Sequence, residues 1–430
     1  AWTTVTPDPA VIEVNQAPYP SSTAFLEASR ELYAIAAEIG LSTYRLQYNG
    51  TLSDSGGGGQ FTLGGATAES SPFLRTPALL PRLIRYVIQH PALSYWFAPD
   101  YLGGSSQSPR PDEGVRELFL ELHLAMAQMQ RRKTPDPEFI WRSFAPFLTD
   151  PSGNSHRADL NIEKLWNPHL PGRGRLGLLE FRAFRMATTP QQATAIAALL
   201  RGILVMLAES DVVPKLTDWG DILHDRFALP YYLQQDLLAV LSDLEAAGLA
   251  FGPALQEALL VNYDKTLWRT RFQGCELEIQ RALEFWPLVG DVASQERGGS
   301  RLVDASTMRW QILLRPTAES QVQFDGWRLS TEGTAIPLRS ERDAEGELRL
   351  CGLRLREFQP WIGLHPAVQP HMPLRLTLSH PDLPQALQVR IHAWQPDALP
   401  YPGLPRDLEE ARQRREERLT QAVIPADTLA

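Results

Sequence analysis

The sequence predicts an α+β protein in which a helix-rich region with short polar strands precedes an all-β domain. Apolar residues recur at helical spacing in most of the chain before Trp268. From Trp268 onward, short segments alternate polar and apolar residues between turns rich in Gly, Pro or Asp, as in an antiparallel sandwich or barrel. We therefore expect an α+β domain over residues 1–267, a sandwich-like β domain over 268–400 and a charged C-terminal helix or tail over 401–430.

Length and composition are those of an ordinary globular protein with room for two or three domains. The 430 residues carry 41 Lys plus Arg and 50 Asp plus Glu, giving a formal net charge of -9. This charge argues against nucleic-acid binding through bulk charge. Two cysteines supply no disulfide framework, which indicates a reducing, cytoplasmic location. Because no apolar run approaches about 18 residues, we expect no membrane partner.

The first predicted elements are a short strand and an amphipathic helix. Residues 11–15, bounded by prolines, place Glu13 and Asn15 on one strand face. A Ser-Ser-Thr segment then caps a helix predicted over 24–39. Because Ala1 leads almost at once into the strand, we expect the chain to be part of a longer protein.

Four consecutive glycines, at positions 56–59, follow a polar loop and lead into Gln60. Glycine permits positive φ and lets backbone N–H groups approach a ligand closely. However, no Lys follows at the spacing of a phosphate-binding P-loop, and the run does not match a dinucleotide fingerprint. A flexible hairpin or linker is therefore the competing interpretation.

Helices account for most of the chain between the glycines and residue 250. The predicted ranges are 77–95, 112–132, 139–148, 191–207 and 229–247. His224 and Asp225 lie next to each other before the last of these helices. Such a pair is more often structural than catalytic, but it leaves open a hydrolase that uses this pair, or His156 with Asp159.

The densest group of polar residues precedes a strand over residues 178–186. Four of its members fall within six positions: Asn154, His156, Arg157 and Asp159. On the strand, Glu180 and Arg182 share one face. A strand face with Glu and Arg either meets water or lines a polar cleft. Both interpretations are open at this point. If the strand face lines a cleft, this stretch is the candidate site.

The β-rich region shows no convergent cluster of reactive side chains, and its strands mix Arg and Glu on their polar faces. We expect it to serve stability, substrate capture or docking rather than chemistry. Its tryptophans are core residues by default. The highly charged helix that follows, predicted over 407–421, is expected to be exposed.

An ordered set of motifs spans nearly the whole chain. They are V-T-P-D-P-x-V-I-E-V-N, G-G-G-G-Q-F-T-L-G-G, H-P-A-L-S-Y-W-F, G-G-S-S-Q-S-P-R-P-D-E, T-D-P-S-G-N-S-H-R-A-D, G-R-L-G-L-L-E-F-R-A-F-R-M and W-G-x-x-L-H-D-R-F-x-L-P. The set resembles a bacterial amidoligase family whose members usually carry an N-terminal transglutaminase-like domain. That family is grouped with carboxylate–amine ligases of the glutamine-synthetase and glutamate–cysteine-ligase type.

The resemblance implies an antiparallel glutamine-synthetase-like sheet with helices, and a reaction that uses ATP and Mg²⁺. Such ligases form an amide or peptide-like bond through an acyl phosphate. The implied partners are small-molecule or peptide carboxylate and amine substrates, and the transglutaminase-like part of the same protein. Glu13, Asn15 and Glu180 would hold the metal, since Mg²⁺ prefers hard oxygen donors.

The resemblance also implies catalytic and nucleotide-binding roles. The catalytic residues would be Glu180, Arg182, His156 and Arg157. The residues along the nucleotide would be Gly57, Gly58, Gly59, Gln60, Arg110 and Asn154. In these roles Arg side chains neutralise phosphate or carboxylate, and Glu180 is either a metal ligand or the base that takes the amine proton.

Two positions depart from the family pattern, which usually has His at Gln60 and an acid at Arg185. Gln can hydrogen-bond a phosphate but cannot carry charge or shuttle a proton. A lost carboxylate weakens a metal site directly. The alternative function is therefore a degenerate ligase that acts as a non-catalytic binding or scaffold module.

Overall fold

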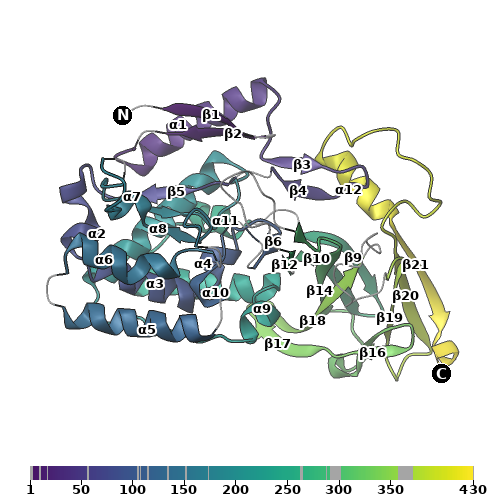
Figure 1. Cartoon of the computed structure of the whole chain (residues 1–430). Helices are drawn as coiled ribbons and strands as arrows, with labels where there is room; N and C mark the ends of the chain where they lie inside the picture. Colours follow the sequence, from purple (N-terminus) through teal and green to yellow (C-terminus); the bar gives the residue numbers. More distant parts are fainter. Residues whose placement is uncertain are drawn as a thin grey trace.

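The protein consists of a helical body that carries a small antiparallel sheet, with a β-sandwich beside it (Figure 1). Helices and antiparallel sheets together confirm the predicted α+β class. The computed structural model describes residues 3–8, 11–16, 18–55, 58–103, 106, 108–113, 116–132, 135–150, 153–172, 174–261, 265–286, 288–290, 302–356 and 371–429.

The helical body is built around α8 (Pro190–Glu209), which begins where Thr189 caps the Gln192 N–H. It packs against α1 (Ser22–Glu38), α3 (Leu79–Gln89), α10 (Pro230–Ala246) and α11 (Pro253–Leu260). By length and composition alone α8 could cross a membrane, which corrects the expectation that no segment is long and apolar enough. Because 56% of that stretch is buried in the body, we describe α8 as a core helix.

The helix predicted over residues 77–95 is in fact two helices, α3 and α4 (Ala92–Tyr95). Pro91 separates them, because the residue before a proline is driven out of the helical region and His90 has ψ 85. Two further helices, α5 (Arg116–Arg131) and α6 (Pro137–Phe144), lie close to their predicted places. Three short helices were not predicted: α2 (Pro72–Arg75), α7 (Glu163–Trp166) and α9 (Ile222–Arg226).

A three-stranded antiparallel sheet lies on the helical body. Its order is β5 (Phe61–Leu63), β8 (Leu179–Phe181) and β7 (Leu160–Asn161). Phe61 pairs with Phe181, while Glu180 lies opposite both Thr62 and Asn161. The Phe residues belong to the helical core, so the opposite face of the sheet is the polar one.

The N-terminal strands form a separate hairpin, in which β1 (Thr4–Asp8) pairs with β2 (Val11–Asn15). Among the described strands, these two pair only with each other. The predicted strand at 11–15 is therefore confirmed, but it does not belong to the sheet that carries Glu180.

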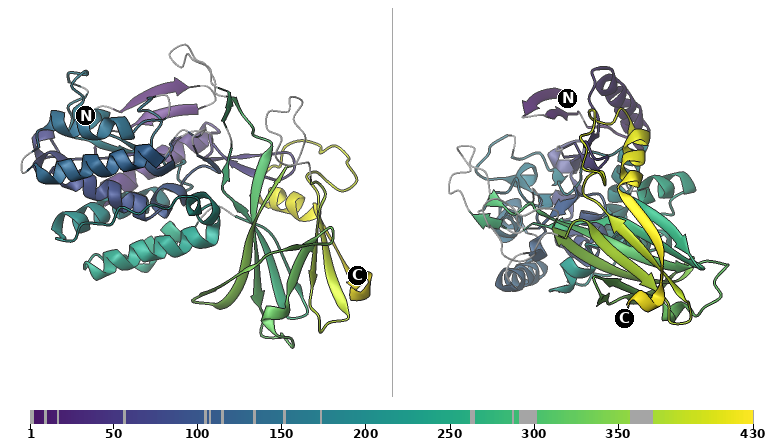
Figure 2. Two further views of the ribbon diagram at one scale, coloured as in Figure 1. Left: turned by 60° about the horizontal axis from the view of Figure 1, so that its bottom comes forward. Right: turned by 90° about the vertical axis from the view of Figure 1, so that its right-hand side faces the viewer.

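Two five-stranded antiparallel sheets form a sandwich (Figure 2). It extends beyond the predicted β domain over 268–400, because residues 419–425, in the segment predicted as a charged helix or tail, form one of its strands. The first has the order β17 (Arg339–Asp343), β18 (Gly346–Arg356), β14 (Thr307–Pro316), β10 (Cys275–Ala282), β9 (Thr266–Phe272). The second has the order β16 (Thr334–Ile336), β15 (Arg328–Thr331), β19 (Leu374–Ser379), β20 (Gln385–Ile391), β21 (Leu419–Pro425). One apolar cluster, which includes Trp310 and Trp327, joins the two sheets.

The final helix, α12 (Leu408–Glu417), joins the sandwich to the hairpin of β3 (Tyr44–Leu46) and β4 (Leu52–Asp54). Arg414, Arg415 and Arg418 are buried. They donate to backbone carbonyls in the turn between β3 and β4. The expectation of an exposed final helix is thus wrong for this face, because its buried guanidinium groups supply hydrogen bonds to these carbonyls.

A second connection is formed by β6 (Tyr101–Leu102) and β11 (Glu284–Phe285), which pair in parallel. A short hairpin follows, made of β12 (Leu288–Gly290) and β13 (Leu302–Val303). Backbone bonds from Leu283 to Ala228 and from Glu284 to Asp100 extend this junction between the body and the sandwich.

Candidate functional site

The centre of the candidate site is Glu180, a carboxylate held between two cations. Its Oε1 accepts from Nη1 of Arg182 at 2.6 Å, and its Oε2 lies 3.0 Å from Nζ of Lys164. Glu180 is only 4% exposed. The interpretation of this strand face as a solvated surface is therefore wrong for Glu180, although the Lys164 side chain remains 43% exposed.

Arg182 is held by several hydrogen bonds, but one of its buried donors has no partner. Its Nη1 also donates to Oε1 of Gln60 at 3.3 Å. Its backbone N–H donates to the Asp159 carbonyl, and its own carbonyl accepts from the Ser108 hydroxyl. The Nε of Arg182 is buried without a hydrogen-bond partner. A buried guanidinium edge of this kind is suited to an acceptor oxygen from a ligand.

A second polar group adjoins Glu180 across the β7–β8 pairing. Asn161, opposite Glu180, donates to the Ser155 carbonyl and accepts from the Glu163 N–H. The Glu163 carboxylate in turn accepts from the Ser155 hydroxyl and lies 3.3 Å from Nε2 of His156. His156 is therefore at the rim of the site, with its side chain 66% exposed.

Asn154 and Arg157 belong to the turn that precedes this group. The Asn154 side chain accepts from the His156 N–H, and its backbone N–H donates to Asp150. The Arg157 N–H donates to the Asn154 carbonyl. In the structure Asn154 thus shapes the turn, which is a common role for Asn.

Arg110 lies behind the site rather than in it. The five N–H groups of its buried guanidinium donate to both Asp112 carboxylate oxygens, the Val87 and Ile88 carbonyls and the Ser94 hydroxyl. Because Arg has five such donors, none remains for a nucleotide. We therefore do not carry Arg110 into the proposed site.

Asp159 shares this buried network. It accepts from the Ser94 hydroxyl at 3.2 Å, and its Oδ1 has no partner. Burial raises the pKa of Asp159 to about 7, and the nearby Arg110 only partly opposes that effect. Since the Asp159 carbonyl holds the Arg182 backbone, this acid lies directly beneath the candidate site.

The described part of the glycine run packs against the segment that follows β8. Gly58 forms a bridge with Arg185, and the Gly59 N–H donates to the Phe184 carbonyl at 2.8 Å. A Cβ on Gly59 would come within 2.3 Å of the Arg185 carbonyl oxygen. Close backbone packing is thus a sufficient reason for glycine at 59. Gly57 lies outside the described residues.

The expected metal ligands do not come together. Glu13 and Asn15 are exposed on the β1–β2 hairpin, where the Asn15 amide donates to the Glu13 carboxylate at 2.9 Å. Both oxygens of Glu180 already face cations. In the described part of the chain, no group of three or more His, Cys, Asp and Glu residues is placed to hold a metal.

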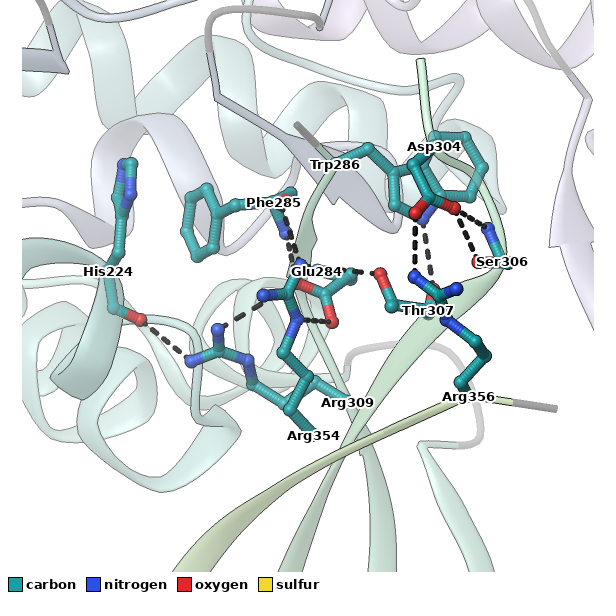
Figure 3. Close-up of polar contacts among 10 residues, drawn as sticks. All are labelled: His224, Glu284, Phe285, Trp286, Asp304, Ser306, Thr307, Arg309, Arg354 and Arg356. Atoms are coloured by element: carbon teal, nitrogen blue, oxygen red, sulfur yellow. Dashed lines mark hydrogen bonds and ion pairs between the residues drawn. The ribbon is translucent and has the colours of Figure 1, made fainter. Parts of the chain in front are cut away.

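The hydrolase pairings do not form either. His156 lies next to Glu163, whereas Asp159 is bound to Ser94. The His224 ring stacks on Phe285 (Figure 3), with ring centroids 3.7 Å apart, and its Nε2 lies 3.8 Å from Glu113. These histidines therefore contact Glu163 and Glu113 rather than the neighbouring Asp residues.

Sequence reasoning missed three members of the site: Lys164, Asn161 and Glu163. One signal was present, because Lys is rare in this chain and Lys164 follows the polar stretch closely. Asn161 lies opposite Glu180, and the Glu163 N–H donates to Asn161. The sequence does not indicate these contacts, because a strand gives way to a helix between the two residues. Only the fold shows that α7 brings Lys164 back over β8.

Comparison with known proteins adds one positive finding. No curated protein and no solved structure matches the chain. A family model described as "Putative amidoligase enzyme (DUF2126)" matches residues 1–428. This match confirms the resemblance indicated by the ordered motifs, and the protein belongs to this amidoligase family.

Proposed function

We propose that the protein is an ATP-dependent carboxylate–amine ligase whose carboxylate substrate binds on the polar face of the β5–β8–β7 sheet. The observation that carries the proposal is the Glu180 cluster. Arg182 and Lys164 bring two positive charges against the single charge of Glu180, and Nε of Arg182 still lacks a partner. A carboxylate or an acyl phosphate is the kind of group that such a cluster attracts.

In this proposal each residue of the cluster has a defined task. Arg182 and Lys164 bind the substrate oxygens, and Glu180 keeps both cations oriented. When the amine nitrogen attacks the acyl carbon, phosphate leaves with the electron pair of the broken C–O bond. The amine must also lose a proton, and the leaving phosphate can accept it. Gln60 accepts from Arg182, and Asn161 lies opposite Glu180 in the β7–β8 pairing.

ATP would supply the phosphoryl group that activates the carboxylate. The exposed Lys164 and the unpartnered edge of Arg182 are suited to phosphate, which supports this part of the proposal. We also propose that the three-stranded sheet corresponds to part of the antiparallel sheet of glutamine-synthetase-like ligases. We further propose that the protein is cytoplasmic, where ATP is available. We also propose that it cooperates with a transglutaminase-like part of the same protein.

Magnesium does not fit the donors that the structure describes. A metal site needs free oxygen ligands, yet the Glu180 oxygens are engaged and Glu13 lies on another element. We therefore assign no described residue to Mg²⁺ and derive no step through it. Dependence on Mg²⁺ is predicted from the family resemblance alone.

The test mixes the full chain with ATP, Mg²⁺ and pools of carboxylates and amines, and measures release of ADP and phosphate. We expect release that requires a carboxylate, and a fall of about 100-fold in Arg182→Met. The matched control is Arg142→Met, because the Arg142 side chain is 69% exposed on α6 and should not affect the rate. Absence of release with every pair, or equal rates in both variants, would contradict the proposal.

A second candidate is a degenerate ligase that binds without turnover. It is favoured by the residues at the two positions that depart from the family pattern: Gln60 contacts Arg182, and Arg185 donates to the Ala98 carbonyl. This candidate predicts that calorimetry detects binding of ATP or a carboxylate while no ADP forms. Turnover with any substrate pair would exclude it.

A further inference from the structure

The rim of the candidate site contains a histidine that lies against a carboxylate and opens to solvent. Nε2 of His156 is 3.3 Å from Oε2 of Glu163, and the Ser155 hydroxyl donates to Oε1 of the same carboxylate. The Glu163 side chain is only 22% exposed, whereas that of His156 is 66% exposed. The carboxylate is therefore partly shielded from water, while the imidazole can meet a molecule that arrives from solvent.

The carboxylate of Glu163 determines which ring nitrogen of His156 can accept a proton. Because a carboxylate carries only acceptor atoms, it favours the tautomer whose hydrogen lies on the nearer nitrogen, Nε2. The lone pair then lies on Nδ1, and among the described residues the side chain of His156 makes its polar contact through Nε2 alone. A carboxylate in this place also stabilises the imidazolium that forms when the ring takes up a proton. The pair is thus suited to general base chemistry at Nδ1.

This pair adjoins the cations that we assign to the carboxylate substrate. Glu163 and Lys164 are consecutive residues of α7, and Nζ of Lys164 lies 3.0 Å from Oε2 of Glu180. Asn161 lies opposite Glu180 in the β7–β8 pairing, where paired side chains share one face of the sheet. Its Oδ1 accepts from the Glu163 N–H at 2.8 Å. The site therefore has a part with two cations around Glu180 and, next to it, an imidazole and a carboxylate at the rim.

Building on the proposed ligase function, we propose that His156 is the base that accepts a proton from the amine substrate, and that this substrate is a primary amine that arrives in its cationic form. An alkylammonium group has no lone pair, so it can attack the acyl phosphate only after it has lost a proton. In this step an N–H bond breaks, its electron pair stays on nitrogen, and the proton binds Nδ1 of His156. The exposed imidazolium then releases the proton to water.

The second proton of the amine follows a different route. The free amine attacks the acyl carbon, phosphate leaves with the electron pair of the broken C–O bond, and the second proton passes from nitrogen to the leaving phosphate. Glu163 is a positioning residue: it orients the ring of His156 and balances its positive charge while the proton is held. A nucleophile that arrives without a positive charge does not need this pair.

The test compares two nucleophiles in reactions of the full chain with ATP, Mg²⁺ and the pool of carboxylates. One is a pool of primary alkylamines, which are cationic at neutral pH. The other is hydroxylamine, which is uncharged at neutral pH and converts acyl phosphates into hydroxamates. In His156→Gln we expect kcat with the alkylamines to fall about 100-fold, while the rate of hydroxamate formation changes less than about twofold. The loss with alkylamines should diminish as the pH rises, because more of the amine is then already uncharged.

Glu163→Gln is the second variant, and it should lower kcat with the alkylamines by about tenfold and leave hydroxamate formation unchanged. The matched controls are His123→Gln, at an exposed position on α5, and Glu138→Gln, whose side chain is 56% exposed on α6. Both controls should keep the rates of the unmodified chain with either nucleophile.

The outcomes separate this inference from the proposed function. If His156→Gln loses no activity with alkylamines, or loses equal activity with both nucleophiles, His156 is not the base, although the ligase function stands. If the unmodified chain forms hydroxamate but accepts no primary amine, the assigned class of amine is wrong. If the unmodified chain forms no hydroxamate with any carboxylate, the proposed function fails, and the role of His156 fails with it.

Discussion

The backbone N–H of Arg182 donates to the carbonyl of Asp159, which joins the candidate site to a buried polar network. On one side of this bond, Arg182 and Glu180 face the polar surface of the small sheet. On the other side, Asp159, Ser94 and Arg110 are buried together. Because this bond joins backbone groups, substitution of a side chain does not remove it. Mutations can therefore test the stability of the network and the geometry of the site separately.

Asp159→Asn should change the pH dependence of stability. The pKa of Asp159 is raised to about 7 in the folded protein, so the folded state holds its proton more tightly than the unfolded state does. Stability then falls as pH rises from about 4 to 7, and this loss is on the order of a few kcal/mol. The Asn variant lacks that loss. Chemical denaturation between pH 4 and 8 should show a difference between the two proteins that grows with pH.

The control for this comparison is Asp211→Asn, at an exposed position. Its stability should follow that of the unmodified chain at every pH. If the difference between Asp159→Asn and the unmodified chain is constant from pH 4 to 8, Asp159 does not titrate in this range.

Arg110→Lys should reduce stability by about 3 kcal/mol or more, because it leaves buried acceptors without donors. Arg110 donates to two carbonyls, a hydroxyl and the Asp112 carboxylate at once, which an ammonium group cannot reproduce. Urea denaturation measures the loss. An unchanged midpoint together with weaker ATP binding would instead return Arg110 to the nucleotide site.

Gly59→Ala should be destabilising by about 1–3 kcal/mol, since its Cβ would meet the Arg185 carbonyl oxygen at 2.3 Å. Gly403→Ala is the matched control, because a Cβ there meets nothing within 4 Å. Thermal unfolding of both variants is the measurement. Equal midpoints would show that Gly59 is not packed against the segment that follows β8.

Lys164→Met should weaken substrate binding without much loss of stability. Lys164 is 43% exposed, and the buried Glu180 keeps its contact with Arg182 in this variant, so we expect a loss of only about 1 kcal/mol. We expect the KM for the carboxylate to rise roughly tenfold, with a smaller change in Lys164→Arg. Lys215→Met, at an exposed position, is the control. An unchanged KM in Lys164→Met would remove this residue from the site.

The alternation of polar and apolar residues predicted the sandwich well, because side chains in a strand point to opposite faces in turn. The same rule placed Glu180 and Arg182 together, and the structure confirms their contact at 2.6 Å. This rule cannot predict which strands pair with one another. The strand of Glu13 was predicted correctly, but its place in a separate hairpin was not.

Long-range contacts decided the remaining differences. Lys164 reaches Glu180 because α7 follows β7 after a short turn, and no local pattern reports that return. Arg110 was a plausible phosphate ligand until its buried acceptors were known. Pro91 was a local signal for a break between α3 and α4, but the apolar periodicity on both sides concealed it.

Positional isotope exchange tests the proposed chemistry most directly. ATP labelled with ¹⁸O in the bridge between its β and γ phosphates is incubated with the full chain and a carboxylate, without an amine. Reversible formation of an acyl phosphate should scramble the label, and Arg182→Met should stop the scrambling. If ATP binds and yet no carboxylate in a broad pool causes scrambling, carboxylate activation at the Glu180 cluster is contradicted.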